Sequence, residues 1–162
     1  MLRLSLIGSA LIAITVVIHA TGTTAWVRHL SKKFAGKSLT TGRRATLILV
    51  NTALIVFVLH TLEIVVWAGA YQLLLPVNEL GTFEEAVYFS FVTFTTLGYG
   101  DITLSEGWRL LSGIEALNGI LLVGWTTAMI FSVVQNIWRG IGENNTEESG
   151  EKHDYCEQFK DR

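Results

Sequence analysis

Apolar side chains gather in three long runs along the chain, at residues 4–27, 45–71 and 108–138. A helix rises about 1.5 Å per residue, so each run is long enough to cross a hydrocarbon core of about 30 Å. A fourth apolar run, residues 83–95, is too short to cross and too apolar to be exposed. Such a segment favours a re-entrant helix buried among the others. The pattern predicts an all-α membrane protein with three transmembrane helices and one re-entrant helix.

Composition agrees with a membrane location. The 162 residues are 50% hydrophobic and only 16% charged, and the mean hydropathy is +0.44, which is too apolar for an ordinary soluble domain. A cleavable signal peptide is an alternative for the first run, but the run is longer than a typical signal core. The only cysteine, Cys156, lies in a polar tail, so a disulfide framework within one chain is excluded.

The segment 28–44 carries positive charges without any acid. Short loops rich in Lys and Arg stay in the cytoplasm, so we expect the N-terminus outside, the C-terminus in the cytoplasm, and some attraction to anionic lipid headgroups. If the first run were a cleaved signal peptide, this basic segment would have to be exported. That requirement counts against cleavage. We expect no nucleic-acid partner, because no aromatic side chains are interleaved with these charges. The basic residues are Arg28, Lys32, Lys33, Lys37, Arg43 and Arg44.

A helix-start signal precedes the short apolar run, and a pattern of glycines follows it. Thr82 and Glu85 have the spacing of a capping box, in which each side chain bonds a free backbone N–H at a helix start. Gly98 and Gly100 follow the run and can take positive φ without steric cost. Backbone that alternates between left- and right-handed conformations can direct successive carbonyl oxygens to one axis. This alternation is what we expect directly after the short helix.

The string TTLGYGD, residues 95–101, resembles the selectivity filter of potassium channels, and residues 88–101 as a whole resemble their pore helix and filter. The resemblance implies a homotetrameric, potassium-selective channel with an extended filter, without enzymatic activity, cofactor or soluble small-molecule ligand. Backbone carbonyls replace the hydration shell of the permeant K⁺. The ion sites implied are the carbonyls of Thr96, Leu97, Gly98 and Tyr99 with the Thr96 hydroxyl, next to Gly100.

Residues around the filter are expected to support it. Thr95 and Asp101 flank it, and Tyr99 is expected to point away from the pore and pack against aromatic residues of the pore helix. Val92 departs from the glutamate that pairs with the outer aspartate in some two-helix bacterial channels, so Asp101 loses that partner. The expected support residues are Thr95, Asp101, Tyr88, Phe89 and Val92.

The third long run resembles the pore-lining inner helix of the same family. Gly119 is a candidate hinge and Phe131 a candidate hydrophobic gate, although simple packing explains either residue as well. They belong to a stripe at i+4 spacing that would face the cavity of the pore. The stripe consists of Gly119, Val123, Thr127, Phe131 and Gln135.

Ionisable residues inside the long runs form a further candidate site. Glu63 and Glu115 lie about 10 Å and about 12 Å below the outer ends of their helices by helix rise, and His60 shares a helix face with Glu63. With Asn118 they are expected to form one polar layer behind the filter, since isolated carboxylates in lipid are costly. The layer could be structural or could make conduction sensitive to pH. His19 is interpreted as a hydrogen-bonded helix residue, not a ligand, because no second ligand lies at a useful spacing.

These patterns divide the chain into an extra helix (1–27), a basic cytoplasmic loop (28–44), a pore domain (45–139) and a polar cytoplasmic tail (140–162). The tail is too short and polar to build a core, and the first run lacks the arginine series of a voltage sensor. The expected location is a bacterial inner membrane or a plasma membrane. A potassium-transporter subunit usually carries four degenerate filter loops in a longer chain, and a non-conducting scaffold would not need an intact GYG. Both alternatives remain open at this point.

Overall fold

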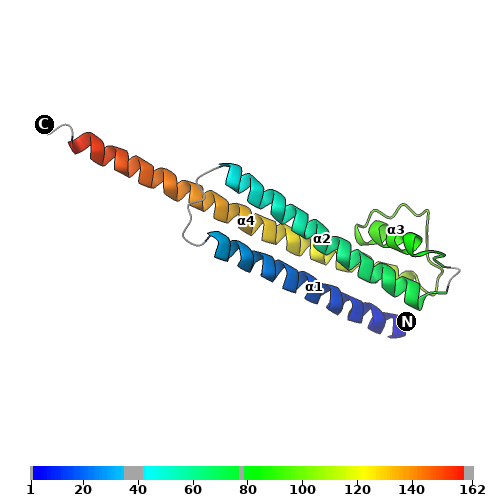
Figure 1. The fold of residues 1–162 in the computed structure, drawn as a ribbon. Helices are drawn as coiled ribbons and strands as arrows, with labels where there is room; N and C mark the ends of the chain where they lie inside the picture. Colours follow the sequence, from blue (N-terminus) through cyan, green and yellow to red (C-terminus); the bar gives the residue numbers. More distant parts are fainter. Residues whose placement is uncertain (1, 35–41, 77–78, 159–162) are drawn as a thin grey trace.

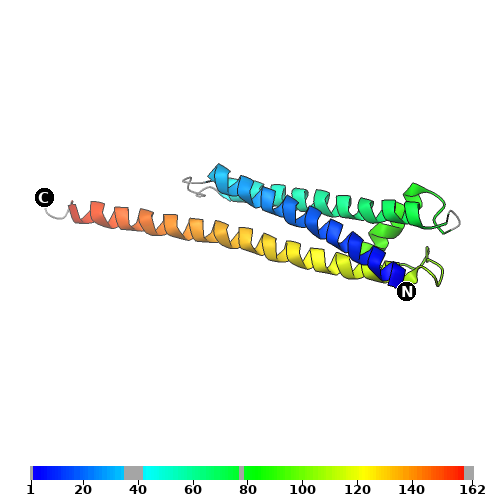
Figure 2. The same cartoon turned by 90° about the horizontal axis from the view of Figure 1, so that it is seen from below.

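The computed structural model describes residues 2–34, 42–76 and 79–158. Its helices are α1 (Leu2–Phe34), α2 (Gly42–Leu74), α3 (Phe83–Phe94) and α4 (Arg109–Gln158). The three long helices lie side by side, and short α3 lies at the end of the bundle where the N-terminus is found (Figures 1 and 2). Helix α4 extends far beyond the other helices at the opposite end. The described part of the chain contains no strand, so the expected all-α fold is confirmed.

The three long helices each contain a segment suited to crossing a membrane: Leu2–Lys32, Gly42–Leu74 and Arg109–Gly140. Large apolar side chains remain exposed on all three, with Leu54 at 57% and Leu117 at 62% exposure. In an aqueous protein such surfaces would mark interaction sites, whereas lipid or a neighbouring subunit covers them in a membrane. The protein is therefore a multi-pass integral membrane protein.

The helices are longer than the apolar runs that predict them. α1 continues past residue 27 to Phe34, and α2 begins at Gly42, because Lys and Arg are good helix formers. Most of the basic side chains thus sit on helix ends, while Lys37 lies outside the described residues. The backbone of the polar tail likewise continues α4 as far as Gln158.

A buried core joins α3 to the neighbouring helices near the N-terminal end of the bundle. Trp67 and Tyr71 of α2 and Leu111 of α4 have no exposed surface, and Phe94 at the end of α3 is also buried. α3 contacts both α2 and α4. This packing holds the short helix between the two long helices that flank it in the sequence.

α1 packs against both α2 and α4 through small residues. A Cβ atom on Gly8 would lie 2.8 Å from Ile114 of α4, and one on Gly22 would lie 2.5 Å from Leu59 of α2. Small residues at such contacts let helices approach closely within a membrane. The extra N-terminal helix is therefore an integrated part of the bundle.

Candidate functional site: the filter segment and the buried polar groups behind it

The start of α3 has the capping geometry that the sequence predicts. Glu85 N–H donates to Thr82 Oγ1 at 3.1 Å, and the Glu85 carboxylate accepts from the N–H groups of Thr82 at 3.3 Å and Gly81 at 2.7 Å. The prediction of a capping box is confirmed. The reciprocal bonds fix where the helix begins and therefore where its C-terminal end points.

The backbone after α3 alternates in hand. φ is +59° at Thr96, +56° at Gly98 and +79° at Gly100, and no other residue of the filter segment 95–101 has positive φ. Gly98 and Gly100 were predicted to take this conformation, whereas Thr96 was not. Positive φ is uncommon for a β-branched residue, so propensity alone gives no signal for it. The alternation itself requires a left-handed residue at every second position.

Hydrogen bonds tie the inner end of this segment to α3. Thr96 N–H donates to Thr93 O at 2.9 Å, and Gly98 N–H donates to Val92 O at 3.2 Å. The Thr95 hydroxyl donates to Phe91 O at 2.6 Å. These bonds use carbonyls at the helix end that have no partner within the helix, so the helix and the segment after it are held as one unit.

The filter segment is open on one side in the single chain. Leu97 is 54% exposed and Tyr99 is 68% exposed. The expected packing of Tyr99 on aromatic residues is thus not completed within one chain and stays a prediction about a neighbouring subunit. Phe89 is buried and packs edge-on against Tyr71 of α2, with ring centroids 5.3 Å apart, so it supports α3 from the side of α2.

Asp101 has a partner that the sequence analysis missed. The Tyr88 hydroxyl donates to Asp101 Oδ2 at 2.6 Å. Val92 occupies the position where a glutamate was noted to be absent, and Tyr88 lies one helical turn earlier on α3. The hydrogen bond from Tyr88 lowers the pKa of Asp101 below its usual range, because it stabilises the ionised carboxylate. The sequence signal for this partner was a tyrosine one helical turn before Val92.

We expect the Tyr88→Phe variant to raise the pKa of Asp101, since the hydroxyl that stabilises the carboxylate is removed. Asp101 should then take up a proton at higher pH as the solution is acidified. The measurement is a ¹³C NMR titration of protein labelled at aspartate in detergent micelles. Asp154 and Asp161 are the only other aspartates and serve as internal references. An unchanged Asp101 titration in the variant would contradict the assignment of Tyr88 as its stabilising partner.

A second carboxylate joins the chain before α3 to the chain after the filter segment. Ser105 N–H donates to Glu79 Oε2 at 2.9 Å, which lowers the pKa of Glu79. Glu79 precedes α3 and Ser105 follows the filter segment, so this bond joins the segments on either side of them. Both Glu79 and Asp101 therefore favour their ionised forms at this end of the bundle.

The buried polar groups behind the filter segment form separate contacts instead of one layer. Glu63 lies within hydrogen-bonding distance of His19 and His60, whereas Glu115 accepts a hydrogen bond from the Tyr71 hydroxyl at 2.7 Å. Asn118 Nδ2 donates to Thr15 of α1 at 2.8 Å. Among the described residues no hydrogen bond or ion pair links Glu63 to Glu115, so the expectation of one shared layer is wrong in this respect. Equal depth on two helices does not decide which faces meet.

Glu115 and Tyr71 are both fully buried. Removing the hydroxyl in a Tyr71→Phe variant leaves a buried acceptor with one partner fewer, which costs about 1–3 kcal/mol. We expect a lower melting temperature for purified protein in detergent, measured by intrinsic fluorescence or calorimetry. The Tyr88→Phe variant loses an exposed hydrogen bond and is the control, with a smaller effect expected. Equal melting temperatures for Tyr71→Phe and wild type would contradict a stabilising role for this bond.

The candidate gating residues lie in two environments on α4. Gly119 is buried against the end of α3: a Cβ atom there would lie 1.9 Å from Phe94 O. Phe131 is 60% exposed, and Thr127 is exposed with its hydroxyl donating to Val123 O at 2.9 Å. The later part of the stripe is uncovered in the single chain, as a pore-facing surface would be, and its gating role stays a prediction.

The fold and this site define a multi-pass membrane protein in which two candidate spans flank a short helix and an irregular segment that is exposed in the single chain. Irregular backbone within a membrane occurs where it is buried in protein or lines a water-filled path. Residues 59–136 match the family described as Ion channel, which supports an ion channel domain in this part of the chain. The family is not an enzyme class and requires no cofactor. No curated protein and no solved structure matches the chain.

Proposed function

We propose that four copies of this chain form a potassium-selective channel, in which residues 95–101 of each copy contribute to one filter on the symmetry axis. The observation that carries the proposal is the left-handed backbone at Thr96, Gly98 and Gly100. A ribbon that alternates in this way can direct successive carbonyl oxygens to one side. A single chain supplies one such ribbon, and a closed ring of oxygens requires a cyclic assembly. The permeant K⁺ would be held by the carbonyls of Thr96, Leu97, Gly98 and Tyr99.

The position of α3 supports cation conduction. Its C-terminal end carries a partial negative charge and lies next to the inner end of the filter segment. The carboxylates of Glu79 and Asp101 would raise the cation concentration at the other end. The basic residues at the far ends of α1 and α2 favour a cytoplasmic location there. In the proposed orientation the N-terminus and the filter mouth therefore lie outside.

Ion flux into liposomes tests the proposal. Purified protein is reconstituted into vesicles loaded with either K⁺ or Na⁺, and uptake of a tracer cation in exchange for the loaded ion is measured. We expect tracer uptake into vesicles loaded with K⁺ but not into vesicles loaded with Na⁺. Cross-linked protein should migrate as a tetramer. Equal flux of the two ions would overturn the selectivity, and a stable monomer in lipid would overturn the assembly.

A further inference from the structure

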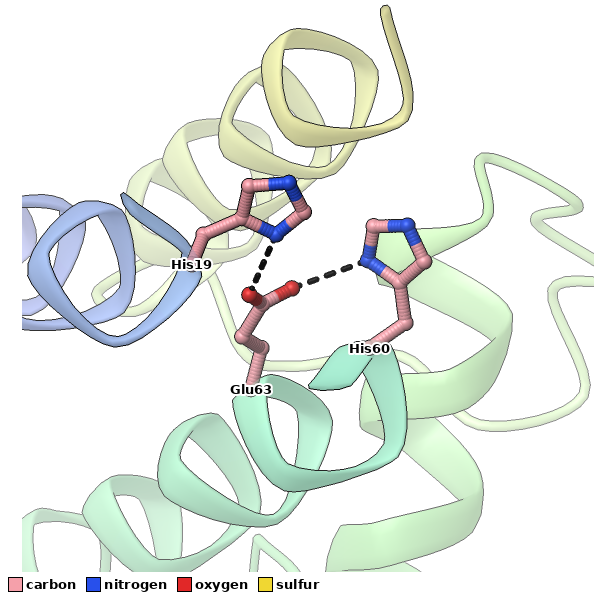
Figure 3. Close-up of side chains that lie close together, drawn as sticks. All are labelled: His19, His60 and Glu63. Atoms are coloured by element: carbon pink, nitrogen blue, oxygen red, sulfur yellow. Dashed lines mark hydrogen bonds and ion pairs between the residues drawn. The ribbon is translucent and has the colours of Figure 1, made fainter. Parts of the chain in front are cut away.

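Two histidines and a glutamate from different helices point toward one another in the centre of the bundle (Figure 3). His19 comes from α1, and His60 and Glu63 come from α2. His19 Nδ1 lies 2.8 Å from Glu63 Oε1, and His60 Nδ1 lies 2.9 Å from Glu63 Oε2. One ligand atom from each of the three residues can be chosen so that all lie within 4.8 Å of one another. His19 and Glu63 are fully buried, while His60 retains 17% side-chain exposure.

We propose that His19, His60 and Glu63 bind a divalent first-row transition ion of the Zn²⁺ type. Two imidazoles and one carboxylate are a ligand set that binds Zn²⁺ with a fourth position left for water. Imidazole nitrogens favour Zn²⁺, Cu²⁺ or Ni²⁺ over Mg²⁺ and Ca²⁺, which prefer oxygen ligands. Tetrahedral ligands about 2.0 Å from the ion lie about 3.3 Å apart. Each Nδ1 atom would thus move about half an ångström away from its Glu63 oxygen, and the three ligand atoms already lie within 4.8 Å of one another.

Thr126 of α4 provides the second contact of both imidazoles. Its Oγ1 lies 3.1 Å from His60 Nε2 and 3.3 Å from His19 Nε2. A hydroxyl oxygen can accept two hydrogen bonds, so both Nε2–H groups can donate to Thr126. In that tautomer both Nδ1 lone pairs face the space beside Glu63. An acceptor on the distal nitrogen is the usual way in which a metal-bound imidazole is oriented.

Without an ion, two neutral imidazoles beside an ionised Glu63 cannot satisfy all of these contacts. Both Nδ1–H groups would donate to Glu63, and both Nε2 atoms would then need a donor. The Thr126 hydroxyl has one hydrogen and can serve only one of them. A bound ion removes this shortage, because Thr126 then acts only as an acceptor toward the two rings. The contacts are therefore satisfied either by a bound ion or by one extra proton on the three side chains, and the metal titration below distinguishes the two.

The surroundings suit a cation at this place. The ring of His60 lies 5.9 Å from the ring of Phe94 at the C-terminal end of α3, and this helix end carries a partial negative charge. Trp125 of α4 lies edge-on to His19, with centroids 5.7 Å apart, and shields it. The partly exposed His60 gives an ion a route in. A bound ion would fasten α1 to α2 and, through Thr126, hold α4.

Cobalt absorption spectroscopy tests the site directly. Co²⁺ in a tetrahedral N/O site absorbs visible light, so full-length protein in detergent is titrated with Co²⁺ and then with Zn²⁺. A His153→Gln, Cys156→Ser background removes the imidazole and the thiol of the tail. We expect one Co²⁺ per chain, displaced by Zn²⁺, and a higher melting temperature with Zn²⁺. The readout is independent of ion flux, so its failure leaves the channel proposal untouched.

Matched variants locate the ion. His19→Gln and Glu63→Gln should lose the Co²⁺ spectrum, whereas His29→Gln, which changes an exposed histidine of α1, should keep it. Thr126→Val should weaken binding about 10–100-fold, and Thr126→Ser should restore it, as expected for an orienting partner. A wild-type protein without the spectrum shows a hydrogen-bonded cluster only and overturns the proposal. Binding that His19→Gln and Glu63→Gln leave unchanged overturns it as well.

Discussion

The Gly98→Ala variant should lose potassium-selective flux. Gly98 has a φ of +56°, where an L-residue with a Cβ costs about 1–2 kcal/mol. In the proposed tetramer that cost recurs in every subunit around one ring. We expect the backbone to relax toward negative φ, which turns the adjacent carbonyl away from the axis. Flux into liposomes should fall at least about tenfold, since about 1.4 kcal/mol already corresponds to that factor, and the preference for K⁺ over Na⁺ should be lost.

Gly107→Ala is the matched control for the filter variant. Gly107 has negative φ and no neighbour within 4 Å of an added Cβ, so its replacement should leave flux and selectivity unchanged. Gly98→Ala should still assemble, because no atom of the single chain lies closer than 4.0 Å to its added Cβ. Selective flux that survives in Gly98→Ala would remove the argument that the alternating backbone forms the filter.

Gly119→Ala should destabilise the protein, because the added methyl group has no space. Its Cβ would lie 1.9 Å from Phe94 O and 2.8 Å from Phe94 C. These are backbone atoms at the end of α3, so no side chain can rotate away. Overpacking of this kind costs about 1–3 kcal/mol. We expect a lower melting temperature in detergent and reduced flux, because α3 and α4 must separate.

Two other glycines of α4 provide controls, for which the melting temperature is expected to change in the opposite direction or not at all. Added Cβ atoms on Gly113 and Gly124 meet nothing within 4 Å in the single chain. Replacing a helical glycine by alanine there favours the helix by about 1 kcal/mol, so the melting temperature should hold or rise. If Gly119 served only as a hinge, Gly119→Ala would behave like these two variants. That result would contradict the close-packing role given to Gly119.

Local patterns predicted much of the architecture. The long apolar runs, the short apolar helix and the Thr82–Glu85 capping box concern neighbours in sequence, and helical periodicity and capping act over a few residues. Gly98 and Gly100 indicated left-handed backbone because only glycine takes it freely. Helix ends were less predictable, since lysine, arginine and glutamate are tolerated both in helices and in loops. The basic segment and the tail therefore prove more helical than their polarity suggested.

Contacts between helices were beyond the reach of such patterns. His19 was set aside because no ligand lies near it in sequence, yet helix packing places it against Glu63 at 2.8 Å. Glu63 and Glu115 have similar depths, but rotation about the helix axes gives them different partners. Tyr88 reaches Asp101 only because the chain turns back after α3. The sequence alone determined the membrane spans, the ion channel family resemblance and the filter string. Only the tertiary structure decided which polar groups meet, because that depends on how the helices rotate and cross when their small residues pack.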